Sequence, residues 1–144
     1  ICSDGEIRSY SRKISGPLLD RIDLYVSVMR PKYSELTAVV KGEPSVDIAK
    51  RVAEARAVQS ERLATWHMQS NAQMGHKQLR ETCQLDKEGS ELLREVFEKL
   101  HLSARSYDRI IKVSRTIADL SGSVNIQPEH VAEALSYRNM IQRR

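Results

Sequence analysis

Residues 102–123, LSARSYDRIIKVSRTIADLSGS, decide the fold of this chain. Their apolar side chains recur with the three- and four-residue spacing of one helix face. Ser103 is a residue type that caps helix N-termini, and Gly122 is a residue type that ends helices. The stretch therefore predicts a helix over residues 104–120 with one buried face.

Outward from this helix, the same spacing and capping signals predict helices over 45–66, 76–82, 87–100 and 128–139. The short loops between the later helices indicate antiparallel neighbours in a small bundle. The long helix 45–66 carries an apolar stripe made of Ile48, Val52, Ala55 and Leu63. The expected core of the bundle consists of Leu92, Val96, Leu100, Tyr107, Ile110, Ile111, Ile117, Leu120, Val131 and Leu135.

The N-terminal part of the chain has a different pattern. Residues 6–13 could make two helical turns, and a Ser-Gly-Pro break precedes a short predicted helix at 18–22. From 24 to 29 the side chains alternate between two faces, which predicts a strand, and 31–45 reads as a linker. Because a single strand lacks backbone partners, the strand is either the remnant of a larger sheet or pairs between molecules.

Composition limits the class of protein. The 144 residues suffice for one domain with its own core, and no apolar run approaches the about 20 residues that span a bilayer. Lys and Arg number 23 against 19 acids, with both signs interspersed, so an anionic partner is allowed but not indicated. Cys2 and Cys83 resemble neither a disulfide framework nor a metal site. We expect a soluble, cytoplasmic protein and, since Ile1 does not look like a start, a piece of a longer chain.

The sequence contains no complete catalytic constellation: a phosphate-binding G-x-x-x-x-G-K-[ST] loop, a G-x-S-x-G elbow and metal-ligand patterns are all absent. Two arginines nevertheless occupy unusual places. Arg21 lies between two acids just before the predicted strand. Arg105 lies in the first turn of the predicted helix 104–120, where acids are favoured over bases. From spacing alone, Arg21 could simply be an ion-pair partner of Asp20 and Asp23, and Arg105 of Asp108.

Four stretches resemble, in the same order along the chain, the C-terminal part of the magnesium-chelatase-like AAA+ ATPases of the ComM or YifB type, a family of bacterial competence and DNA-processing proteins. These stretches are YSRKISGPLLDRIDL at 10–24, NAQM at 71–74, the helix stretch at 102–123, and EHVAEALSYR at 129–138. Together they span most of the chain. The resemblance gives both unusual arginines a possible role.

The fold that this resemblance implies is mainly helical. It comprises the C-terminal remnant of an AAA+ α/β core with one strand at 1–30, a linker and long connecting helix at 31–70, and a helical lid domain at 71–144. The resemblance also implies that Arg21 is an arginine finger, presented to ATP on the neighbouring subunit. Arg105 would be the sensor-2 arginine, which reads the γ-phosphate of a nucleotide on its own or on a neighbouring subunit.

The resemblance further implies that the intact protein uses ATP and Mg²⁺ in a ring, expected to be a hexamer, that acts on DNA without a membrane partner. The family's phosphate-binding loop, Walker B acids and sensor-1 residue lie before this region, so we expect the fragment alone to be inert and to hold no cofactor tightly. Arg109 and Arg115 are expected on the lid surface or at an interface. The alternative is a stand-alone helical module that binds nucleic acid or protein through the basic residues Lys50, Arg51, Arg56 and Arg62.

Overall fold

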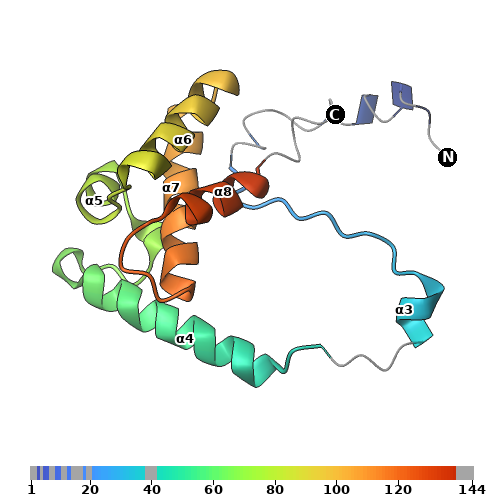
Figure 1. Ribbon diagram of the computed structural model, residues 1–144, viewed down its shortest axis with the longest axis horizontal. Helices are drawn as coiled ribbons and strands as arrows, with labels where there is room; N and C mark the ends of the chain where they lie inside the picture. Colours follow the sequence, from blue (N-terminus) through green and yellow to red (C-terminus); the bar gives the residue numbers. More distant parts are fainter. Residues whose placement is uncertain are drawn as a thin grey trace.

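The computed structural model describes residues 3, 5–6, 9–10, 13, 18, 21–37 and 42–138 of the chain (Figure 1). Its labelled elements are the helices α3 (Tyr33–Thr37), α4 (Ser45–Arg62), α5 (His76–Thr82), α6 (Lys87–Lys99), α7 (Ala104–Leu120) and α8 (Pro128–Ser136), and the 3₁₀ turns η1 (Ala64–Trp66) and η2 (Asn71–Gln73). The mainly helical fold expected from the sequence is confirmed.

Helix α7 lies at the centre of the bundle (Figure 1). It packs against α8, α4, α5 and η2, while α6 packs against α8. At its start, the side-chain oxygen of Ser103 accepts the backbone N–H of Ser106 at 3.1 Å. Just past its end, Gly122 has a φ of 70°, a conformation that glycine adopts without a steric penalty. Both ends predicted for this helix are confirmed.

The core lies between α7 and the helices around it. Four residues of the predicted core are buried, namely Ile110, Ile111, Val131 and Leu135, and a further four are partly buried against them, namely Leu92, Val96, Tyr107 and Ile117. Leu120 was predicted wrongly and is 46% exposed, because Ala118 and Asp119 occupy the inner face of the last turn of α7. The prediction missed Met74, Leu79, Cys83, Leu93, Ala118, Ile126 and Ala134.

The segments that precede α6 and α8 are joined to each other. Leu85 and Ile126 form an isolated parallel bridge between the segments that precede α6 and α8. Beside this bridge, Asp86 caps α6 by accepting the backbone N–H of Gly89 at 2.7 Å. The start of α6 is thereby fixed against the segment that leads into α8.

The prediction of a strand at 24–29 is wrong. Residues 22–32 form neither helix nor strand, and they extend away from the bundle toward α3 (Figure 1). Val26, Val28 and Met29 are 70%, 90% and 84% exposed, because no strand among the described residues lies beside them to pair with their backbone. The expected turns at 6–13, the helix at 18–22 and Cys2 fall wholly or partly outside the described residues. Helix α8 ends at Ser136, short of the predicted end at 139, which also lies outside them.

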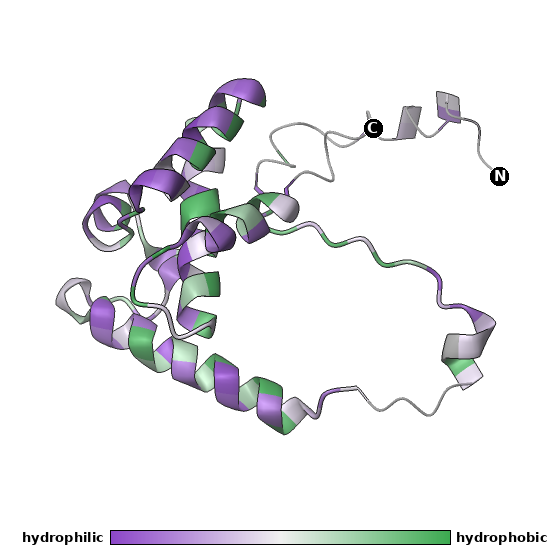
Figure 2. Cartoon of the chain, viewed as in Figure 1, coloured by the Kyte–Doolittle hydropathy of each residue, from purple (hydrophilic) through white to green (hydrophobic). Residues whose placement is uncertain are grey.

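Only the C-terminal half of α4 contacts the bundle. Ala55 and Leu63 are buried, as the predicted stripe requires, but Ile48 and Val52 are 43% and 46% exposed. Figure 2 shows apolar residues continuing along α4 into the half that lies away from the other helices. The helix starts at Ser45 itself, which is therefore the first helical residue and not the cap that the sequence predicted.

Candidate functional site

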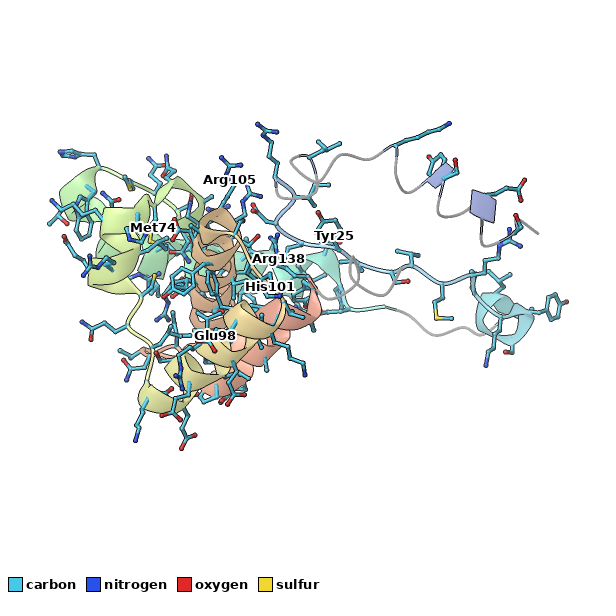
Figure 3. The ribbon with its side chains drawn as sticks, turned by 90° about the horizontal axis from the view of Figure 1, so that it is seen from above. Tyr25, Met74, Glu98, His101, Arg105 and Arg138 are labelled. Atoms are coloured by element: carbon cyan, nitrogen blue, oxygen red, sulfur yellow. The ribbon has the colours of Figure 1, made fainter. Side chains whose placement is uncertain are left out.

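Arg105 lies in the first turn of α7 with its side chain exposed (Figure 3). Asp108, the partner expected from spacing, instead has its Oδ1 atom 3.1 Å from Nδ1 of His76. Among the residues that the structure describes, no ion pair involves Arg105. A cation at the positive end of a helix dipole is unfavourable, so this position suits an arginine that receives an anion.

The segment that follows Arg21 is attached to the bundle where α7 and α8 meet. The carboxylate of Asp23 lies 2.6 Å from the guanidinium of Arg109 on α7. Two residues later, the backbone N–H of Tyr25 donates to the carbonyl of Tyr137, just past the end of α8, at 3.0 Å. An otherwise irregular segment is therefore held at a defined place.

Arg138 completes this attachment. Its guanidinium donates to the carbonyl of Ile22 at 3.4 Å and to the side-chain oxygen of Ser106 at 3.2 Å. Ser106 is buried and directly follows Arg105. We call Ser106, Arg109, Tyr137 and Arg138 the α7–α8 junction; Figure 3 shows Arg105, Arg138 and Tyr25 at this end of the bundle.

The two arginines singled out from the sequence thus belong to connected parts of the molecule. Arg21 is exposed and immediately precedes the attached residues, and its backbone N–H donates to the carbonyl of Leu18 at 3.0 Å. Sequence reasoning missed Arg138. It expected Arg109 on the lid surface or at an interface; the side chain of Arg109 is 21% exposed and pairs with Asp23. The charge alternation around Arg21 was a signal for an ion pair, but the partner of Asp23 comes from α7.

A second set of polar side chains is buried between α4, η2 and α7. The two Oδ atoms of Asp119 accept hydrogen bonds from Arg62 at 2.8 and 2.7 Å, from Arg115 at 3.0 Å and from Asn71 at 2.8 Å. Asn71 also donates to the hydroxyl of Thr116 at 3.0 Å and accepts from Arg62 at 3.0 Å. We call Arg62, Asn71, Arg115, Thr116 and Asp119 the α4–α7 network.

The electrostatics of this network favour the ionised carboxylate. Burial alone would raise the pKa of Asp119, but hydrogen bonds from Arg62 and Asn71 and the charge of Arg115 outweigh it, and the pKa lies below its ordinary value. Arg115 uses its remaining donors on the carbonyls of Val124 and Ser123, at 2.8 and 2.6 Å. Apart from Nε of Arg62, which is buried without a hydrogen-bond partner among the described residues, the polar groups of the network are satisfied, so the network joins α4 to α7.

Sequence reasoning interpreted several members of this network incorrectly. Arg115 was expected on the lid surface or at an interface but is 2% exposed inside the bundle, and Arg62 was assigned to a basic binding face but pairs with Asp119. A signal was available, because Arg115 and Asp119 fall on the same stripe of α7 as the buried Ile111 and Ala118. Polar residues at the positions of an apolar stripe indicate a buried hydrogen-bonded group.

The basic face of the alternative, stand-alone module is correspondingly reduced. Besides Arg62, Arg51 also has an acidic partner, because its guanidinium forms an ion pair with Glu43. Two of the four basic residues of that hypothesis, Lys50 and Arg56, are then left for a nucleic acid. This arrangement argues against a strong electrostatic binding surface on α4.

In the part of the chain that the structure describes, no three His, Cys, Asp or Glu side chains gather as metal ligands would. Its helices include none with the length and apolar character needed to cross a bilayer.

Comparison with known families agrees with the resemblance seen in the sequence. The family model described as the C-terminal part of magnesium chelatase subunit ChlI matches residues 42–138, and the model described as magnesium chelatase subunit ChlI matches residues 1–36. Since the first match alone covers more than half of the chain, the chain belongs to the magnesium chelatase ChlI family.

Three relatives show what the chain is similar to within this family. The chain is 39% identical over 141 residues to the competence protein ComM of Haemophilus influenzae, covering 97% of this chain and 27% of ComM. It is 36% identical over 138 residues to the uncharacterized protein YifB of Escherichia coli, covering 95% of this chain and 26% of YifB. An uncharacterized protein of Mycobacterium bovis is 34% identical over 144 residues, the whole of this chain and 28% of the relative. The chain therefore spans about a quarter of the length of these relatives.

Proposed function

We propose that this chain is the C-terminal part of an AAA+ ATPase in which Arg21 is the arginine finger and Arg105 the sensor-2 arginine. The observation that carries the proposal is the α7–α8 junction. It holds the residues after Arg21 against the helix that presents Arg105. Both arginines are exposed, and Asp108, the acid expected beside Arg105, pairs with His76 instead.

The chemistry of these residues fits a polyphosphate. ATP with Mg²⁺ would supply the transferring phosphoryl group, whose charge spreads over its oxygens in the transition state. Arg21 has a planar guanidinium with several donors, which stabilises such charge better than a lysine does. Arg105 and the positive end of the α7 helix dipole can face the same anion.

Within this proposal, residues 1–30 complete an α/β core, 31–70 form the linker and connecting helix, and 71–144 form the lid. The subunits form a ring, proposed to be a hexamer, and the phosphate-binding and Walker B residues come from a longer chain. The competence role in the name of the ComM relative supports DNA as the substrate. The 144-residue chain alone is proposed to be catalytically inert.

The test uses the longer protein that carries this chain. Changing Arg21→Ala should lower ATP turnover by about three to five orders of magnitude while leaving ATP binding nearly intact, because a finger acts mainly in the transition state. Arg105→Ala should weaken nucleotide binding as well as hydrolysis. Arg30→Ala, another exposed arginine of the same segment, is the matched control and should change neither.

A mixing experiment separates action on the neighbouring subunit from action within one subunit. Rings assembled from Arg21→Ala subunits and subunits that cannot bind ATP contain interfaces where an intact Arg21 meets a bound nucleotide. If the finger acts between subunits, these mixed rings regain activity that neither parent has. Normal turnover by Arg21→Ala rings, or no recovery on mixing, would contradict the proposal.

A further inference from the structure

The segment that carries Arg21 has few means of holding a fixed position by itself. Residues 22–32 form no regular secondary structure and are exposed, apart from the half-buried Tyr25. Burial of apolar surface therefore contributes little to their placement. The contacts that the structure shows for the first residues of this segment are polar, and α7 and the end of α8 provide their partners.

We infer that Arg109 is a positioning residue for Arg21, holding Asp23 and thereby tying the finger to the helix that carries Arg105; this inference rests on the proposed function. The two charged groups are 2.6 Å apart, and the side chain of Arg109 is 21% exposed. The side chain of Asp23 is 60% exposed, so only the Arg109 side of the pair is shielded from solvent and salt.

The geometry of α7 gives this pair a further role. Arg105 and Arg109 are four residues apart and therefore lie on the same side of the helix. Arg138 braces the arrangement, because it bonds both to Ser106, next to Arg105, and to Ile22, next to Arg21. A movement of α7 when Arg105 gains or loses a phosphate would displace Asp23 and with it the finger. The nucleotide sensed at one site is then coupled to hydrolysis at the site that Arg21 serves.

The test compares Arg109→Gln and Asp23→Asn in the longer protein. Each should lower kcat by about 10- to 100-fold, the effect of misplacing a catalytic group by about 1 Å, with little change in the KM for ATP. The charge-swapped double variant Asp23→Arg with Arg109→Asp should recover most of the loss. Arg80→Gln, an exposed arginine on α5 that loses the same charge, is the control and should turn over normally.

A double-mutant cycle shows whether Arg109 acts through Arg21. In rings that already carry Arg21→Ala, the further change Arg109→Gln should cost nothing, whereas an independent or merely structural role would give an additional loss. The Asp23 variant guards against misfolding, because the side chain of Asp23 is 60% exposed and lies outside the core.

The outcomes separate this inference from the proposed function. If Arg21→Ala lowers turnover as expected but Arg109→Gln and Asp23→Asn both match the control, or if their losses add to that of Arg21→Ala, the positioning role is overturned and the finger stands. If Arg21→Ala itself turns over normally, the proposed function fails first.

Discussion

Replacing Asp119 by Asn tests the α4–α7 network with a nearly isosteric change. The aspartate side chain is fully buried and receives four hydrogen bonds, two on each oxygen. One oxygen faces Arg62 and Arg115, and the other faces Arg62 and Asn71. Whichever way an Asn amide is turned, its NH₂ group meets two donors and can accept from neither. The substitution also leaves two arginines without a balancing charge.

The expected loss follows from these contacts. Two hydrogen bonds to a charged group are each worth about 1.5–3 kcal/mol, so losing both costs roughly 3–6 kcal/mol. An independent figure, the cost of removing one partner of a buried ion pair, is about 3–5 kcal/mol. We therefore expect Asp119→Asn to lower the free energy of unfolding by about 4 kcal/mol, a large share of the about 5–15 kcal/mol that a small protein has.

Urea unfolding of the 144-residue chain at neutral pH, followed by far-ultraviolet circular dichroism, measures this loss. With a slope of about 2 kcal/mol per molar urea, the unfolding midpoint should fall by about 2 M. Asp47→Asn, an exposed aspartate in the first turn of α4, is the matched control and should cost at most about 0.5 kcal/mol. A midpoint for Asp119→Asn that coincides with that of the control would refute the reasoning.

Two further predictions concern the titration of buried groups. Because the pKa of Asp119 is lower in the folded chain than its ordinary value of 3.8, its stabilising contribution is complete above about pH 3.8 and is lost as the pH falls through the folded-state pKa. The gap in unfolding free energy between the original chain and Asp119→Asn should accordingly be constant near neutral pH and shrink below pH 3.8; a gap that widens in acid would contradict this. For Cys83, burial raises the pKa of the thiol and limits access to it. In a Cys2→Ser background, the native chain should therefore react with a disulfide reagent far more slowly than the urea-unfolded chain does. Equal reaction rates would show that the thiol is accessible in the native chain.

Much of the helical architecture was predictable because its signals are local. Asp86 and Ser103 cap helices by bonding to residues three positions later, and the alternation of apolar and polar residues on α7 follows from 3.6 residues per turn. The strand at 24–29 was predicted from an equally local pattern, yet a strand forms only when a neighbour supplies backbone partners. The side chains at 24–29 do alternate, but the described residues provide no neighbouring strand for them to pair with.

By itself, the sequence determined the positions of the helices of the bundle, the family, and the two arginines that the proposal uses, since each depends on residues close together in the chain or on the order of motifs. Only the tertiary structure decided which charges meet. Asp23 pairs with Arg109, and Asp119 with Arg62, across separations that no short-range spacing rule reaches. The packing of the helices determines which of their polar side chains lie close enough to pair. The attachment of the Arg21 segment to α7 therefore emerged only when the bundle was assembled.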